Sequence, residues 1–245
     1  MRVDFANAFG AVDWGGSQIP ILASEFHVWR YANAGIEIIN LDQQSGRKRA
    51  IFRKKGQLPS VIAAHVGAII NSFRTALDLT SASVAARNGR SPSRDTHFPF
   101  FACFQDFIDP LRGVVRKHWF SQREIEILTN LRPYRGGDDL LCSLHHLDIV
   151  RKHERLLSLS ADPSRLIVIG TGERPEILIS NHQPLEDGTP LFEFAEGASQ
   201  PEWALDFNVV FNETTLPAVH GQSIFQILGG FQRATEEIIS LFAAV

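Results

Sequence analysis

Hydrophobic residues recur at helical spacing over a long stretch from Ser60 to Arg87, with Pro59 suited to its first turn. One face of this predicted helix is apolar and is expected to lie in the core: Ile62, Val66, Ile69, Ile70, Phe73, Leu77 and Val84. The opposite face carries small or short residues: Ala64, Gly67, Ala68, Asn71, Thr75, Ala82 and Ala85. Because a solvent-facing stripe normally carries lysines and glutamates, we expect a second element to pack there and to contact Arg74 and Asp78.

A second helical pattern follows the glycine pair Gly136–Gly137 and runs from Asp138 to about Leu159. Its apolar residues fall nearly all round the helical wheel, which is typical of a buried helix. Polar residues interrupt the pattern along two strips, with His145, Asp148 and Lys152 on one and His146 and His153 on the other. Buried polar groups need partners, so either another element pairs with them or a cleft admits water and ligand.

Strand patterns flank a short turn near the N-terminus, at Gly35–Asp42 and Arg47–Lys55, and together predict a β-hairpin. Most of the second strand is basic: Arg47, Lys48, Arg49, Arg53, Lys54 and Lys55. One interpretation is an exposed edge strand that its charges protect from aggregation. The other is a ribbon that faces the phosphates of RNA.

The remaining segments are short or irregular. Residues 1–20 hold three glycines and Pro20 and are predicted to form a loop or arm, with a short helix after Ile21. Thr96–Phe101 is an aromatic segment in which Pro99 excludes a helix interior. Ser121 and Glu124 have the spacing of a capping box, which predicts a helix that ends before Pro133.

Beyond Ala161 the pattern changes to strand spacing, which predicts an antiparallel meander, and an amphipathic helix at about Gln222–Phe242 is expected to cover it. The predicted fold is therefore α+β, with a helical core of long packed helices and a C-terminal antiparallel sheet. We divide the chain into an arm and hairpin (1–58), the helical core (59–160) and the sheet with its final helix (161–245). We expect these three segments to form one compact unit.

Composition narrows the class of protein. The 245 residues are 44% hydrophobic and 21% charged with a formal net charge of −3, which is typical of an ordinary globular protein without a general attraction to nucleic acid. The cysteines Cys103 and Cys142 fit buried thiols in a reducing compartment. The longest apolar run, Val61–Ile70, is about half of a membrane span. We therefore expect a cytoplasmic protein with no membrane contact.

Four motifs in this order resemble a bacterial family of uncharacterised proteins with the pattern LHNLRSALDHL, T-x-FPIF, LQPY and LHxLNNxDKHR. The matching stretches here are Ile70–Thr80, Thr96–Phe101, Leu131–Tyr134 and Leu144–Leu157. Five residues fall on matching polar positions: Arg74, Asp78, His145, Lys152 and His153. This chain departs from the pattern at four others: Asn71, Leu79, Asp148 and Arg151.

The Asp148–His153 spacing also resembles part of the signature of HEPN domains, which are helical bundles found in many prokaryotic toxins and defence ribonucleases. The leading arginine of that signature is missing here. The resemblance implies a metal-independent protein that acts on RNA, in which a histidine moves the proton of a ribose hydroxyl and a cation holds the phosphate. In that hypothesis His153 is the acid or base and Arg74 the charge clamp, with Asp78 orienting Arg74 and Asp148 pairing with Lys152; His145 completes the candidate site.

Two alternatives compete with this hypothesis. The same charged residues can form a buried network in a non-catalytic binding module, whose partner would contact the aromatic segment or the basic hairpin. A metal-dependent hydrolase could use His145 and Asp148 with His65 or Asn71. A second copy of the chain is a further partner, as a homodimer. No dinucleotide, P-loop or nucleophile-elbow motif occurs in the sequence, so no cofactor is expected.

Overall fold

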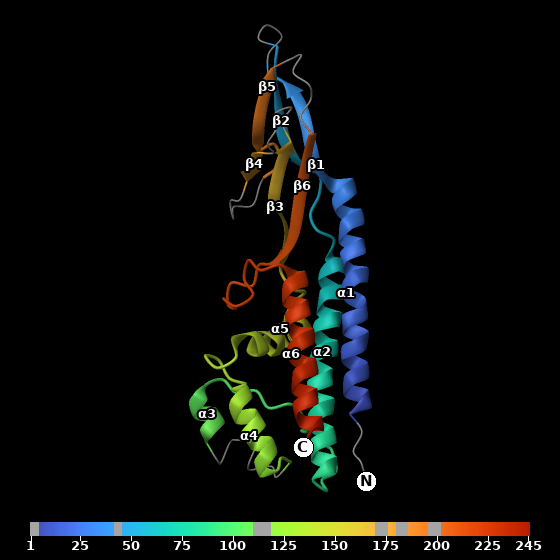
Figure 1. Cartoon of the computed structure of the whole chain (residues 1–245), viewed down its shortest axis with the longest axis vertical. Coiled ribbons are helices and arrows are strands. Elements are labelled where there is room, and N and C mark those ends of the chain that lie inside the picture. Colours follow the sequence, from blue (N-terminus) through green and yellow to red (C-terminus); the bar gives the residue numbers. More distant parts are fainter. Residues whose placement is uncertain (1–4, 42–45, 110–118, 170–175, 180–185, 196–201) are drawn as a thin grey trace.

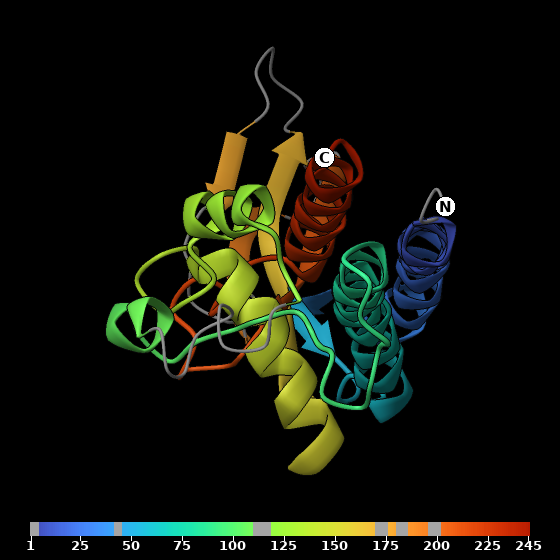
Figure 2. The same ribbon diagram turned by 90° about the horizontal axis from the view of Figure 1, so that it is seen from below.

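The computed structural model describes residues 5–41, 46–109, 119–169, 176–179, 186–195 and 202–245. The molecule is elongated, with strands at one end and long helices at the other (Figure 1). Three helices run side by side: α1 (Ala6–Asn33), α2 (Ser60–Arg87) and α6 (Ile224–Ala243). Figure 2 looks along this bundle and shows α1 at its outer side. The predicted α+β class is confirmed.

Helix α1 corrects the predicted loop or arm over residues 6–20; residues 1–4 of that prediction lie outside the described residues. Its buried residues lie three, four or seven apart, and Gly15 and Gly16 mark close helix contacts. A Cβ added at Gly15 would lie 2.7 Å from Cε1 of Phe73 on α2. Ser72 also donates a 2.6 Å hydrogen bond to the carbonyl of Ala11. Tertiary packing therefore outweighs the low helix propensity of the glycines and Pro20 and stabilises α1 as a helix.

Helix α2 has the predicted bounds, and the whole predicted apolar face is buried. Part of the face of small residues contacts α5 (Asp139–His153), as expected, while Ala64 on the same face is exposed. Gly67 on α2 lies against the side chain of Arg151 on α5, since an added Cβ would be 3.0 Å from its Cδ. Helix α5 ends at His153, six residues before the predicted end, because Leu159 already belongs to strand β3.

The strands form two three-stranded antiparallel sheets. The first has the order β1 (Ala34–Asn40), β2 (Arg47–Lys54), β5 (Pro190–Ala195), and the second has the order β4 (Glu176–Ile179), β3 (Leu159–Ile169), β6 (Glu202–Phe211). The predicted antiparallel strands are confirmed, but their order differs from a meander. Strand β5 joins the N-terminal hairpin, and β3 pairs with β6 along its whole length. The first and last thirds of the chain therefore share one sheet.

The C-terminal helix α6 follows the strands, as predicted, but it packs mainly against α2 and α1, and among the described strands its main contact is with β6. Two short helices, α3 (Phe104–Ile108) and α4 (Gln122–Leu131), lie below α5 in the view of Figure 1, and α4 contacts α6. The predicted capping box opens α4. Among the described helices, α2 alone has the length and mean hydropathy of a membrane span, yet 56% of that apolar window is buried inside the molecule.

The basic strand β2 lies in the middle of its sheet, so the interpretation as an exposed edge strand is wrong. Its arginines pair with acidic residues of neighbouring segments. Arg49 lies 2.5 Å from Glu193 of β5, and Arg53 lies 2.5 Å from Glu37 of β1. Arg47 is 3.3 Å from the same Glu193. These pairs offset the positive charge of the three arginines of β2, which one interpretation of the sequence assigned to RNA binding.

Candidate functional site

Arg74 and Asp78, one turn apart on α2, hold the aromatic segment in place. The Arg74 guanidinium donates to the Asp78 carboxylate and, at 3.4 Å, to the carbonyl of Phe98. Asp78 also accepts a 2.8 Å hydrogen bond from the Phe98 backbone N–H. Arg74 is only 6% exposed and lies over the Phe100 ring at 4.8 Å. Both residues therefore fix an extended backbone that has no sheet partner on this side.

The segment is fixed at its other end by the LRPY stretch. Phe101 donates a 2.9 Å backbone hydrogen bond to the carbonyl of Pro133 and forms an isolated bridge with Tyr134. Three of the motif stretches singled out in the sequence thus meet in space. Their meeting places the rings of Phe100 and Phe101 beside α5.

His145 of α5 contacts both parts of this arrangement. Its ring stacks flat on Phe100, with 4.4 Å between centroids and 2° between planes. Nε of Arg74 donates a 3.3 Å hydrogen bond to Nδ1 of His145, so the ring proton resides on Nε2. Burial, followed by the charge of Arg74, lowers the pKa of His145 to about 4. The imidazole is therefore neutral at physiological pH, with one donor on Nε2.

Asp148 is buried one turn further along α5 and is paired within that helix. Its carboxylate lies 3.0 Å from Nε of Arg151 and 2.6 Å from Nζ of Lys152. The Arg151 stem packs on Gly67, which explains why α2 carries small residues there. The buried carboxylate thus has two cationic partners, as a structural network requires.

His153 is exposed at the C-terminal end of α5. It is eight residues from His145, which corresponds to about 12 Å along the helix axis. The Arg74 guanidinium is fixed beside His145, so the structure does not bring the predicted clamp and the predicted acid or base together. Lys152 is also largely exposed and points its ammonium to Asp148.

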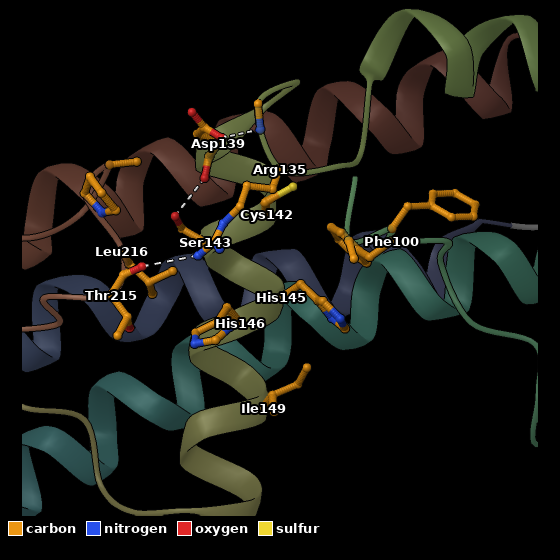
Figure 3. A pocket seen from close by; sticks show the side chains of 15 residues that line it. Phe100, Arg135, Asp139, Cys142, Ser143, His145, His146, Ile149, Thr215 and Leu216 are labelled. Carbon is orange, nitrogen blue, oxygen red and sulfur yellow. Dashed lines mark hydrogen bonds between the residues drawn. The ribbon is translucent and has the colours of Figure 1, made fainter. Parts of the chain in front are cut away.

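A pocket of about 850 Å³ lies beside α5, between the aromatic segment and the loop that joins β6 to α6 (Figure 3). His145 and His146 leave α5 in different directions, His145 toward Phe100 and His146 toward Thr215. The pocket is lined by Phe100, Phe101, Ala102, Arg135, Gly136, Asp139, Cys142, Ser143, His145, His146, Ile149, Thr215, Leu216, Pro217 and Ala218. Of the predicted site residues, only His145 lines it.

The pocket loop is held in place by a buried carboxylate. Glu213 accepts hydrogen bonds of 3.0 and 2.7 Å from Arg155 and one of 2.8 Å from the Ser158 backbone. Burial alone would raise the pKa of Glu213, but these donors outweigh it and lower the pKa. The chain after α5 is thereby tied to the loop that forms the far wall of the pocket.

The polar groups of the pocket show little sign of an activated nucleophile. Burial, followed by Asp138 and Asp139, raises the pKa of the Cys142 thiol to about 11, so it stays protonated at neutral pH. The Ser143 hydroxyl donates a 2.7 Å hydrogen bond to the Asp139 carbonyl of its own helix. Sequence reasoning missed the role of Arg135 and of the Thr215–Ala218 loop, because nothing local to either segment indicates that they meet α5.

The predicted metal ligands are dispersed. His65 binds Glu25 of α1 at 2.9 Å, and Asp148 is held by its two cations. Within the described ranges, no three His, Cys, Asp or Glu side chains come close enough together to hold an ion.

No family model, curated protein or solved structure matches this chain. The resemblances to the motif family and to HEPN domains therefore stay predictions.

Proposed function

We propose that the chain is a non-catalytic binding module whose pocket beside α5 takes a small, largely apolar ligand that carries a hydrogen-bond acceptor. The fixed orientation and neutral tautomer of the His145 ring are the observations that support this proposal most directly. Its ring is stacked on Phe100, accepts from Arg74 at Nδ1 and retains a single proton on Nε2. A neutral donor in an apolar wall supports recognition of a carbonyl or carboxylate oxygen.

The size and lining of the pocket support a ligand of this kind. Small-molecule sites enclose roughly 300–1,000 Å³ and combine apolar walls with a few polar groups. Phe100, Phe101, Ile149 and Leu216 supply apolar surface here. Arg135 adds a positive charge and donates a long 3.4 Å hydrogen bond to the Thr215 carbonyl. That charge favours a carboxylate over a neutral acceptor.

The same contacts favour binding over catalysis. Arg74 donates to Asp78, Phe98 and His145, so a phosphate would have to displace a buried ion pair to reach it. With a pKa of about 4, His145 is a weak base at pH 7 and has no proton to return as an imidazolium. Arg74 and Asp78 thus hold in place the aromatic segment and His145, which form one wall of the pocket.

Benzoate and its cationic analogue benzylamine test this function by calorimetric or NMR titration. We expect benzoate to bind more tightly, because Arg135 and Nε2 of His145 favour an anionic acceptor. Ile149→Trp should fill the pocket and abolish binding. Leu156→Trp changes an exposed residue that does not line the pocket and serves as the matched control. Equal binding of benzoate by both variants would overturn the proposal.

An assay with total RNA distinguishes the ribonuclease hypothesis. We expect no cleavage by the purified protein in the presence or absence of divalent metal. Cleavage that is lost in both His153→Ala and Arg74→Ala would contradict the binding module and favour a HEPN-like enzyme.

A further inference from the structure

Helix α1 carries two apolar stripes with alternating spacings of three and four residues. The inner stripe faces α2 and α6 and consists of Ala8, Val12, Gly15, Ile19, Leu22, Phe26 and Trp29. The outer stripe is displaced by two positions, about 200° around the helix, and consists of Gly10, Trp14, Ser17, Ile21, Ser24, Val28 and Tyr31. Every residue of the outer stripe is exposed. This 3-4 spacing is the repeat by which helices pair in coiled coils.

The outer stripe is unusually apolar for a solvent-facing surface. Trp14 and Ile21 are each 47% exposed, Val28 is 67% exposed and Tyr31 is 87% exposed. The formally charged residues of α1 are Asp13, Glu25 and Arg30, and none belongs to the stripe. Glu25 pairs with His65, and Arg30 lies over the ring of Phe207. A helix that is apolar on both sides is normally buried on both sides.

The position of α1 leaves this surface open along its length. Both views place α1 at the outer side of the bundle, with α2 and α6 on its inner side (Figures 1 and 2). The stripe runs from Gly10 to Tyr31 and is far from the pocket at α5, so it requires its own explanation.

We propose that the outer stripe is the interface of a homodimer in which α1 pairs antiparallel with α1 of a second copy. Of the antiparallel registers that place large residues against small ones, one also brings all four large residues of the outer stripe into the interface. Sliding the helices so that paired residue numbers sum to 45 places Ile21 against the partner's Ser24. The twofold axis repeats each contact with the copies exchanged.

The same register gives complementary layers on both sides of the axis. Val28 lies against the partner's Ser17, so a large residue again faces a small one. Trp14 lies against the partner's Tyr31, so one pair of aromatic rings covers each end of the interface. A parallel pairing would instead stack Ser17 on the partner's Ser17 and leave empty layers between crowded ones. The pattern therefore favours the antiparallel arrangement.

The exposed area predicts a modest affinity. A large side chain presents about 150–250 Å², so the exposed parts of the four large residues amount to roughly 500 Å² per copy. Two copies would bury roughly 1,000 Å², which is the lower bound of a specific interface. We therefore expect a dimer that dissociates at concentrations on the order of micromolar.

Sedimentation velocity of the full chain between about 1 and 100 µM tests the interface. We expect a shift from monomer to dimer over this range. Ile21→Glu should weaken dimerisation at least about tenfold, because it buries two like charges near the twofold axis. Leu241→Glu, at an exposed leucine of α6, is the matched control and should still dimerise. A wild-type monomer at every concentration, or equal effects of both variants, would overturn the proposal, provided that circular dichroism shows both variants folded.

Disulfide cross-linking tests the register in a Cys103→Ser background, which removes the exposed native thiol. The double variant Ser17→Cys/Val28→Cys should form linked dimers on mild oxidation. Ser17→Cys alone should not, because the two thiols of an antiparallel dimer lie on opposite sides of the axis. Linked dimers from Ser17→Cys alone would contradict the antiparallel register.

Discussion

Arg74 holds three partners at once: the Asp78 carboxylate, the Phe98 carbonyl and the His145 ring. The spacing of Arg74 and Asp78 on one helix face was visible in the sequence, and so was the likelihood of a helix contact. The sequence could not show that these charges support an extended aromatic segment. That segment has no helical or strand period, so its position depends on side-chain partners alone.

A change of pH should reveal the neutral state of His145. Its folded pKa of about 4 lies below the ordinary 6.5, so between these values the unfolded chain takes up a proton that the folded chain does not. Stability therefore falls as the pH drops through this window, by roughly 2–3 kcal/mol from this partly accessible group. His145→Gln retains an acceptor for Arg74 and should show a shallower loss in urea unfolding between pH 7 and 4. His27→Gln, at an exposed histidine, is the control; identical slopes in all three proteins would argue against a buried neutral ring.

The two thiols should react at different rates. Cys103 is exposed, whereas burial raises the pKa of Cys142 to about 11. Since the thiolate is the reactive form, iodoacetamide at pH 8 should alkylate Cys103 first, and the rate at Cys142 should rise steeply toward pH 11. Peptide mass spectrometry separates the two sites. Faster labelling of Cys142 at pH 8 would place it in a different environment.

At the scale of elements, the sequence predicted α2, α4, α6 and the first hairpin with bounds within a few residues. It predicted only the part of α1 after Ile21, because Gly15, Gly16 and Pro20 are typical of loops when read locally. Their use in a helix depends on close contact with α2 and α6, as at Gly15 with Phe73 and at Gly16 with Gln232.

Alanine at two glycines of α1 tests this helix and its packing. Gly15→Ala should destabilise the protein by about 1 kcal/mol or more, because its Cβ would overlap the buried ring of Phe73. Gly10→Ala meets nothing within 4 Å and should stabilise by about 0.8 kcal/mol through helix propensity. Thermal and urea unfolding measure both. Similar effects of the two substitutions would contradict the close α1–α2 contact.

The loop between β6 and α6 should depend on Glu213. Glu213→Gln removes a buried charge from the fork of Arg155 and should cost about 1–3 kcal/mol of unfolding free energy. It should also weaken benzoate binding, since the loop carries Thr215 and Leu216 into the pocket. Glu126→Gln, at an exposed residue of α4, is the control for stability. An unchanged stability in Glu213→Gln would show that the ion pair does not hold the loop.

At the scale of the whole molecule, the pocket is assembled from segments that are far apart in the sequence. The aromatic segment near residue 100, helix α5 and the loop after β6 meet there. The first sheet is also assembled from distant segments, because β5 pairs with β2 across more than a hundred residues. Local periodicity predicts elements but does not predict such pairings. The sequence therefore indicated His145 as a candidate without indicating the cavity that it lines.

The most direct test is a ¹⁵N NMR spectrum of the histidine rings, assigned through His145→Gln and recorded with and without benzoate between pH 4 and 8. The account predicts that His145 keeps its proton on Nε2, stays neutral above about pH 5 and shifts at Nε2 when benzoate binds. A His145 ring that titrates near 6.5, or that does not respond to benzoate while the ligand binds elsewhere, would contradict it.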